Sequence, residues 1–148
     1  MHRKIIPDIV KATNVLTMTA EDSAQEAAKQ MASKNVAAMI ISDSAGLITG
    51  IVTERDLCQK VKAKGLDPAS TSVGEIMTTN PDTLSPDDSA SDALELMQNR
   101  KYRHLPVVQD GKCQAVVSVR DLYSAVKETL EEDIRETEAF VFGDRYGT

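Results

Sequence analysis

The chain has 148 residues, of which 41% are hydrophobic and 27% are charged, and its formal net charge is −6. This balance is typical of a folded globular protein and excludes a disordered one. Nucleic acid is excluded as a partner, because a chain with net negative charge, 3% aromatic residues and no tryptophan offers neither a basic face nor a stacking platform.

The first predicted elements form one unit over residues 5–65. A leading segment and a short extended piece precede an amphipathic helix, in which Ala24, Ala27, Ala28 and Met31 recur at helical spacing. Two apolar strands joined by a turn at Gly46 then predict a hairpin, and a second helix follows. In chain order these elements span residues 7–10, 15–18, 24–31, 38–41, 47–52 and 53–65.

The same series is predicted again over residues 73–127, after a linker at 66–72 marked by Pro68 and small polar residues. The last helix is expected to run from Arg120 into the acidic stretch 128–138. Residues 128–148 are therefore a helical extension with an aromatic tail. Because the run 140–142 is apolar, we expect it to pack on its own unit or, as our hypothesis, across a dimer. The elements of the second unit span residues 73–77, 83–84, 90–97, 105–108, 113–117 and 118 onward.

The two units repeat one another in sequence. Asp22-Ser23-Ala24 falls on Asp88-Ser89-Ala90 at an offset of 66 residues, and residues 50–57 overlie 115–122 after one residue is lost in a turn. A unit of roughly 60 residues is marginal by itself. We therefore expect the two units to pack together, related by a pseudo-two-fold axis.

Each closing helix begins with the same pair of side chains, Thr53 with Asp56 and Ser118 with Asp121. A hydroxyl at the N-cap and a carboxylate three residues later predict a capping box. The same helix end exposes N–H groups and a positive dipole, which attract phosphate. Both interpretations stay open, and we favour the ligand role in the second unit.

Basic residues gather near these helix starts. Arg55 and Arg120 are at the second helical position, where the dipole opposes a cation, so either a bound phosphate or a salt bridge would compensate. The cluster 101–104 adds Arg103 and His104, whereas its counterpart 35–38 is neutral. We interpret 101–104 as a phosphate-facing wall, with a solvated turn as the alternative, and expect two unequal sites.

The order strand–helix–strand–strand–helix, repeated twice, resembles a tandem pair of CBS domains, the family named for cystathionine β-synthase. The resemblance covers roughly residues 5–127. The matching segments are Leu105-Pro106-Val107-Val108, Val116-Val117-Ser118-Val119-Arg120-Asp121-Leu122, Ile51-Val52-Thr53-Glu54-Arg55-Asp56-Leu57 and Ile76-Met77.

This resemblance implies an α/β fold (of α+β type) with two β-α-β-β-α repeats and a regulatory role rather than catalysis. It implies an adenosine-containing ligand in the clefts between the repeats, AMP first and otherwise ADP, ATP, NAD(H) or S-adenosylmethionine. It also implies a homodimer formed through the helices, with the tail as a further contact, and an unidentified protein target. The pair nearly fills the chain, so we expect a stand-alone protein similar to small bacterial signalling proteins. The alternative function is a ligand-independent dimeric adaptor.

In this family the hydroxyl of the helix-start motif contacts phosphate, the carboxylate accepts hydrogen bonds from ribose, and backbone groups near Thr17 and Thr83 read the adenine edge. Pro106 would form an apolar wall. We expect the cleft containing Ser118 and Asp121, together with the basic wall, to bind most tightly. The implied ligand-binding residues are Thr17, Thr53, Arg55, Asp56, Thr83, Arg103, His104, Pro106, Ser118, Arg120 and Asp121.

The sequence contains none of the catalytic motifs that we searched for. There is no glycine-rich phosphate loop and no Gly-x-Ser-x-Gly, and two histidines and two cysteines without a Cys-x-x-Cys make a zinc site improbable. No apolar run reaches the roughly 18 residues of a membrane span, and the basic start is not a signal peptide. We therefore expect a cytoplasmic protein with no membrane partner.

Overall fold

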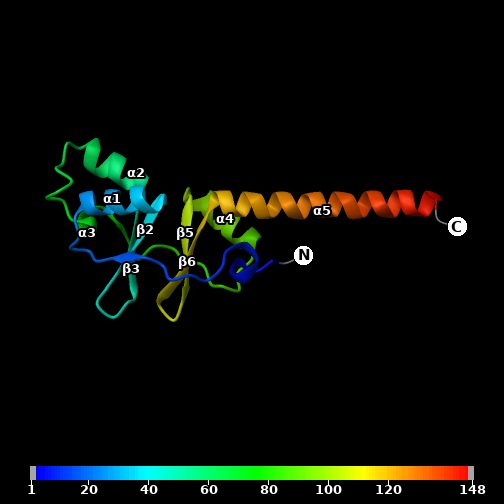
Figure 1. Ribbon diagram of the computed structural model, residues 1–148, viewed down its shortest axis with the longest axis horizontal. Helices are drawn as coiled ribbons and strands as arrows, with labels where there is room; N and C mark the ends of the chain where they lie inside the picture. The colour runs from blue at the N-terminus through cyan, green and yellow to red at the C-terminus, as the bar shows by residue number, and fades with distance from the viewer. Residues whose placement is uncertain (1–2, 147–148) are drawn as a thin grey trace.

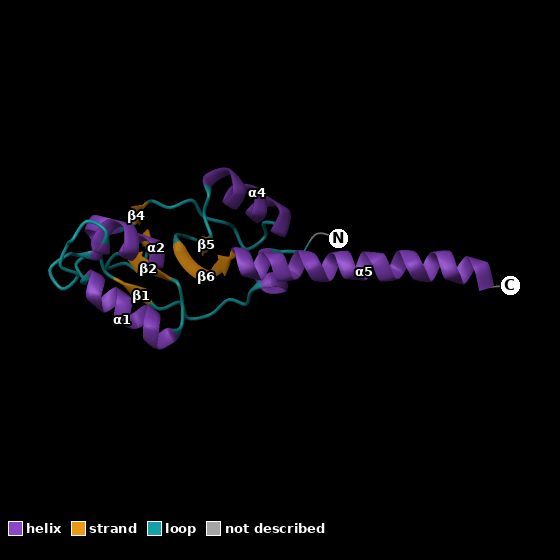
Figure 2. Cartoon of the chain, turned by 90° about the horizontal axis from the view of Figure 1, so that it is seen from above, coloured by secondary structure: helices purple, strands orange, loops and turns teal. Residues whose placement is uncertain are grey.

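The computed structural model describes residues 3–146, with side chains up to residue 141. Two small sheets lie beside one another, helices cover them on one side, and one long helix leaves the body of the molecule (Figure 1; Figure 2). The expected α/β fold of two repeats is thus confirmed.

The first unit forms a four-stranded sheet in the order β1-β2-β3-β4. Strand β1 is parallel to β2, while β2–β3 and β3–β4 are antiparallel. The predicted hairpin is therefore confirmed as β2–β3. The elements of this sheet and its helices are β1 (Thr17–Met18), α1 (Ala24–Lys34), β2 (Ala38–Ser42), β3 (Ile48–Thr53), α2 (Glu54–Asp56), which continues into η2 (Leu57–Lys62), and β4 (Thr78–Thr79).

The second unit contains the other predicted hairpin as a two-stranded sheet, β5–β6. The extended piece expected at 83–84 does not form a strand, and only Leu84 bridges Val107 in parallel. The elements of this part of the chain are α3 (Val73–Ile76), α4 (Ala90–Arg100), β5 (His104–Gln109), β6 (Lys112–Ser118) and α5 (Val119–Tyr146).

Matching caps explain why α1 and α4 have matching bounds. The hydroxyls of Ser23 and Ser89 accept hydrogen bonds from the third helical N–H, of Glu26 at 3.0 Å and of Asp92 at 3.1 Å. Both helices end at a residue in the left-handed conformation. The repeat in sequence is thus a repeat of local hydrogen bonding.

The leading segments of the two units are exchanged. Ile5, in the helical turn η1 (Ile5–Ile9), is fully buried in the core of the second unit, beside Leu105 and Leu122. Conversely, Val73 and Ile76 of α3 are buried in the core of the first unit. Each core is therefore completed by the segment of chain that precedes the other unit.

A third apolar cluster joins the two sheets. Ile40 and Ile51 of the first sheet form it with Cys113 and Val116 of β6. The backbone N–H of Ile48 also donates to Gly111 O at 2.9 Å across this seam. The two units thus share one buried interface, as the marginal size of each unit predicts.

Helix α5 begins one residue earlier than expected and continues past residue 138 as far as Tyr146. Packing of the run 140–142 on its own unit, one of the two alternatives, is contradicted for Phe140 and Val141, which are 71% and 53% exposed. Phe142 lies outside the described side chains, and the dimer hypothesis stays a prediction. Among the described residues, no helix combines the length and the apolar character needed to cross a membrane.

The exchange of leading segments can be tested by truncating one buried side chain in each. We expect Ile5→Ala to lower the free energy of unfolding by about 2–5 kcal/mol, measured by urea denaturation. Amide chemical-shift changes should concentrate on β5 and β6 for Ile5→Ala, and on β2 and β3 for Val73→Ala. Leu66→Ala, at a position 44% exposed in the linker, is the control and should change stability by less than about 0.5 kcal/mol. Shift changes confined to the unit that follows each segment in sequence would contradict the exchange.

Candidate functional site

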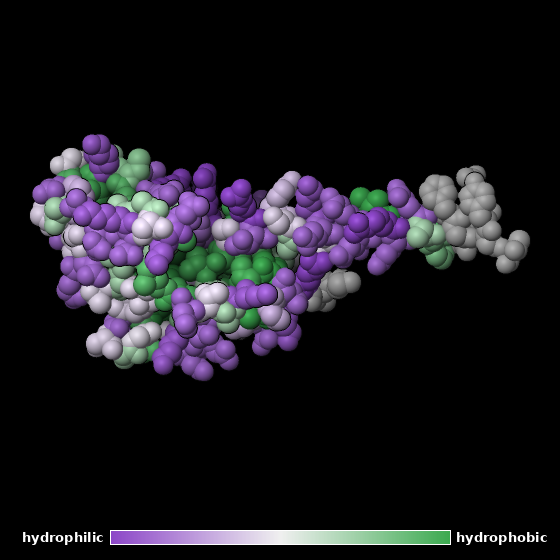
Figure 3. Space-filling model, in the orientation of Figure 1, coloured by the Kyte–Doolittle hydropathy of each residue, from purple (hydrophilic) through white to green (hydrophobic). Residues whose placement is uncertain are grey.

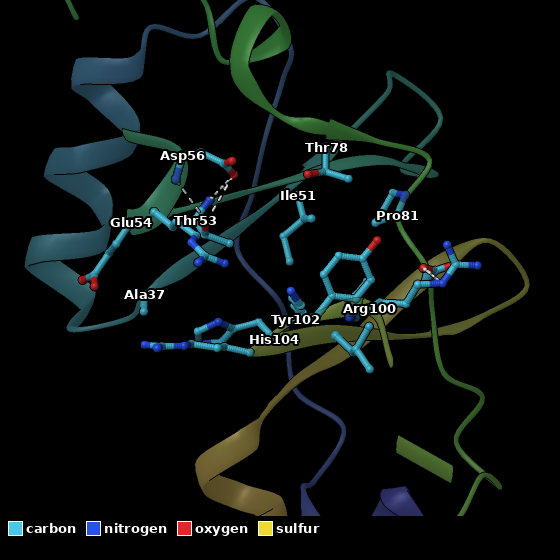
Figure 4. A pocket seen from close by; sticks show the side chains of 16 residues that line it. Ala37, Ile51, Thr53, Glu54, Asp56, Thr78, Pro81, Arg100, Tyr102 and His104 are labelled. Atoms are coloured by element: carbon cyan, nitrogen blue, oxygen red, sulfur yellow. Dashed lines mark hydrogen bonds and ion pairs between the residues drawn. The ribbon is translucent and has the colours of Figure 1, made fainter. Parts of the chain in front are cut away.

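A cavity of about 390 Å³ lies between the two units (Figure 4). Its size is within the range of small-molecule sites in proteins. The first unit and the segment that follows it contribute Ala37, Ile51, Thr53, Glu54, Arg55, Asp56, Thr78, Pro81 and Asp82. The second unit contributes Arg100, Lys101, Tyr102, Arg103, His104, Leu105 and Pro106.

The start of α2 forms one side of this cavity, and its cap is complete. Thr53 N donates to Asp56 Oδ2 at 3.0 Å, and Asp56 N donates to Thr53 Oγ1 at 3.3 Å, which confirms the predicted capping box. Asp56 Oδ1 forms an ion pair with Lys60 Nζ at 3.0 Å. Glu54 N donates to Ala37 O at 3.0 Å, which ties the helix start to the strand region beside it.

Cations line the opposite side of the cavity. Lys101 and Arg103 lie just before β5 and are exposed, and Arg55, on the α2 side, also lines the cavity and is exposed. Arg100 Nε approaches Asp82 Oδ2 at 3.8 Å, whereas Arg55, Lys101 and Arg103 have no ion pair among the residues that the structure describes. An anionic group in the cavity would therefore meet positive charge from both units.

His104 lies within this wall and is partly buried. Burial lowers the pKa of its imidazole, because desolvation disfavours the charged form; Glu54 and Asp121 oppose this effect and Arg103 adds to it. The imidazole is therefore neutral near pH 7. It can accept one hydrogen bond and donate another, and it can take up a proton beside an incoming anion.

The rest of the lining is largely apolar. The ring of Tyr102 reaches into the cavity, which Ile51, Pro81 and Pro106 also line (Figure 4). Burial raises the pKa of the Tyr102 phenol, and Asp82 raises it further. This part of the cavity can hold a flat apolar group, with the Thr78 hydroxyl as a polar neighbour.

The structure brings together six of the residues predicted from sequence and leaves the others outside the cavity. Those in its lining are Thr53, Arg55, Asp56, Arg103, His104 and Pro106. Those not in its lining are Thr17, Thr83, Ser118, Arg120 and Asp121.

The basic wall lies beside the start of α5 as well, because His104 pairs with Ser118 in the β5–β6 ladder and Val119 N donates to Arg103 O at 2.9 Å. The expectation that it shares a cleft with Ser118 and Asp121 therefore stays a prediction. The side chains of Arg103 and His104 line the cavity that contains Thr53 and Asp56. Ser118 and Asp121 form a second capping box at the start of α5, with Ser118 N donating to Asp121 Oδ2 at 2.9 Å and Asp121 N to Ser118 Oγ at 3.1 Å. The part of these two residues in ligand binding stays a prediction.

The remaining predicted residues lie on the surface. Thr17 is in β1 and exposed, and Thr83 is exposed ahead of Leu84. Arg120 is exposed at the second position of α5. Sequence reasoning did not assign Tyr102 or Pro81 to the site, although Tyr102 is part of the basic cluster, because neither shows helical or strand periodicity that indicates a cavity.

Comparison with known proteins gives one consistent family. A family model described as CBS domain matches residues 8–63 and 73–128. CBS domain-containing protein CBSCBSPB2 of Arabidopsis thaliana is 36% identical over 118 residues, which are 79% of this chain and 22% of that protein. CBS domain-containing protein CBSX3, mitochondrial, of the same plant is 32% identical over 132 residues, 86% of this chain and 64% of that protein. The chain thus spans about a fifth of the first of these curated relatives.

Solved structures agree with this assignment. A protein with CBS domains from Burkholderia ambifaria is 35% identical with a TM-score of 0.76, over 82% of this chain and 92% of its own. The CBS domain pair of protein MJ0100, solved with 5-methylthioadenosine and S-adenosyl-L-methionine, is 25% identical with a TM-score of 0.78, over 87% of this chain and 99% of its own.

The lowered pKa of His104 predicts a pH-dependent stability. The unfolded chain binds a proton at this residue near pH 6.5, and the folded chain only at lower pH, so the native state loses stability as the pH falls below about 6.5. We would measure the free energy of unfolding of wild type and of His104→Gln between pH 7.5 and about 5. As the pH falls, the free energy of unfolding of wild type should decrease relative to that of the variant. A difference that stays constant, or that grows in favour of wild type, would contradict the burial of a neutral imidazole.

Proposed function

We propose a ligand for this chain, which belongs to the CBS domain family and is a regulatory module. The proposed ligand is an adenine nucleotide, held in the cavity between the two units. AMP is the first candidate, and ADP, ATP and NAD(H) are the alternatives. A relative with the same fold was solved with two adenosine compounds, which agrees in chemical class with this proposal.

One observation carries the proposal: the basic wall of one unit faces the capped helix start of the other across a single cavity. A phosphate there would accept hydrogen bonds from Arg103 and Arg55 and would meet the positive end of the helix dipole. His104 would gain a proton as the phosphate approaches, because an adjacent anion favours the charged imidazole.

The other parts of a nucleotide have matching surroundings. The adenine ring would lie in the apolar part of the cavity, against Ile51, Tyr102 and Pro106. The carboxylate of Asp56, held in place by Thr53 and Lys60, is the acceptor for ribose hydroxyl groups. The neutral counterpart of the basic wall, residues 35–38, contributes Ala37 to the same cavity, so the positive charge of the wall comes from the second unit alone.

A ligand-independent adaptor is the second candidate, and the complete capping boxes favour it. Thr53 with Asp56 and Ser118 with Asp121 satisfy one another without any ligand. In that case the motifs are purely structural. The homodimer and the cytoplasmic location belong to both candidates and stay predictions.

Arginine variants at matched positions separate the candidates. We expect AMP binding, measured by isothermal titration calorimetry, to weaken by about 10–100-fold in Arg103→Ala and in Arg55→Ala, because a hydrogen bond to a charged group contributes roughly 1.5–3 kcal/mol. Arg120→Ala removes the equivalent arginine of the other repeat, which does not line the cavity, and should change the affinity by less than about twofold. Weakening by Arg120→Ala alone would place the ligand at the Ser118 motif instead.

Thermal unfolding with each nucleotide supplies the broader control. A ligand present at 100 times its Kd stabilises the native state by about 2.7 kcal/mol. If AMP, ADP, ATP, NAD(H) and S-adenosylmethionine all leave the unfolding temperature unchanged, the adaptor is the better description.

A further inference from the structure

Helix α5 extends far beyond the two units (Figure 1; Figure 2). Its first turns contact α4, β6 and η1. Arg3 forms ion pairs with the next turns of the helix, Nη1 with Glu128 Oε2 at 3.3 Å and Nη2 with Glu132 Oε1 at 3.2 Å. Residues 133–141 are all exposed. This projecting part of the helix has a surface of its own, and the nucleotide proposal does not depend on it.

One face of the projecting helix carries a continuous row of residues, which we call the α5 stripe: Leu130, Ile134, Thr137 and Val141. Steps of four, three and four residues place these side chains in the core positions of a heptad repeat. Leu130 and Ile134 are each 57% exposed and Val141 is 53% exposed. Figure 3 shows apolar surface on this helix between hydrophilic side chains. Three exposed apolar side chains in one row, with Thr137 between them, indicate a helix-binding face.

Acidic residues flank the α5 stripe. With Ile134 and Val141 in the a positions, Glu131 and Glu138 occupy e, while Asp133 and the exposed Phe140 occupy g. None of these three carboxylates has an ion pair within the described part of the chain. From residue 128 to 138 the helix has six acidic side chains and one basic side chain, Arg135.

These charges oppose pairing of the stripe with a second copy, and therefore argue against the tail as a further contact of the predicted homodimer. In a parallel pair Asp133 would lie beside Glu138 of the other chain, because g and e positions of successive heptads meet. In an antiparallel pair Glu131 would lie beside Glu138. Like charges in these positions destabilise a coiled coil and select against self-association.

We propose that the α5 stripe is the docking face for a basic amphipathic helix of another protein. Leucine-type side chains of the partner would cover Ile134 and Leu130, and its lysines or arginines would reach the flanking carboxylates. The chain already displays this chemistry once, since Arg3 pairs with two carboxylates of the same helix, Glu128 and Glu132. Docking also supplies the tertiary contacts that an isolated helix needs for stability in water.

The test uses the full chain and two synthetic peptides of about three heptads, both with leucine at the core positions, one with lysine and one with glutamate at the flanks. Fluorescence anisotropy at low and high salt measures binding of each labelled peptide. We expect the lysine peptide to bind, more weakly at high salt, and the glutamate peptide to bind at least about tenfold more weakly. Amide hydrogen exchange of residues 130–141 should slow when the lysine peptide is bound.

Surface variants locate the face. The pair Glu131→Lys with Glu138→Lys, and separately Ile134→Gln, should each weaken binding of the lysine peptide at least about tenfold. Glu136→Lys reverses one charge at the outer c position. It is the matched control for Glu131→Lys or Glu138→Lys made singly, and should change binding by less than about threefold. Circular dichroism confirms that each variant keeps its helix content.

Three results would overturn the proposal. The first is no binding of the lysine peptide, and the second is equal weakening by Glu136→Lys and by the flank variants. The third is a dimer at pH 7, seen by sedimentation, that Ile134→Gln dissociates, because the stripe would then be covered by a second copy of the chain.

Discussion

Neither unit of this protein closes its own hydrophobic core. Ile5 fills the core of the second unit and Val73 fills that of the first, so the two units cannot separate without exposing buried aliphatic side chains in both. Fully burying one such side chain contributes roughly 1.5–3 kcal/mol, which is a large fraction of the stability of a small domain. The relative placement of the sheets, and with it every distance across the cavity, depends on this exchange.

The cavity is a direct consequence of the exchanged segments. After α3 packs into the first core, the chain adds β4 to the first sheet, where Thr78 pairs with Ile51. It then passes Pro81 and Asp82 on the way to the second unit. This connection forms part of the cavity wall between the capped helix start and the basic wall. A site between the units therefore exists because the chain must cross from one core to the other.

The sequence repeat allowed the helices and strands to be predicted. It did not indicate which capped helix start lies across the cavity from the basic wall. The hairpins and capping boxes follow from local patterns of apolar spacing, glycine turns and hydroxyl–carboxylate pairs, and these agree with the structure. Alignment of the repeats shows which residues occupy equivalent positions, such as Ala37 and Arg103. The carbonyl oxygen of each accepts a hydrogen bond from the first N–H of the helix in its own unit, Glu54 N at 3.0 Å and Val119 N at 2.9 Å. Opposition across the seam is a tertiary property, so the sequence indicated that Arg103 lies beside the motif of its own unit, which its hydrogen bond with Val119 confirms, but not that it also lines the cavity with Thr53. The sequence also did not predict that α5 projects from the two units, because an apolar run near the end of the given sequence does not indicate which surface packs against it.

The two helix starts share a cap and differ in charge, and this difference decides where an anion is best held. Lys60 neutralises Asp56 from one turn further along its helix, while the equivalent position in the second repeat is Ala125. Asp121 has no ion pair among the described residues, and after Glu54 it is the second charge that opposes the burial which lowers the pKa of His104. The first helix start combines a neutralised carboxylate with Arg55 and with Arg103 from across the seam. Glu54 also lines this cavity, where the second repeat has Val119, so the proposal that an anion binds beside Thr53, rather than at the Ser118 motif favoured by sequence alone, depends on the cations that line the cavity from both units.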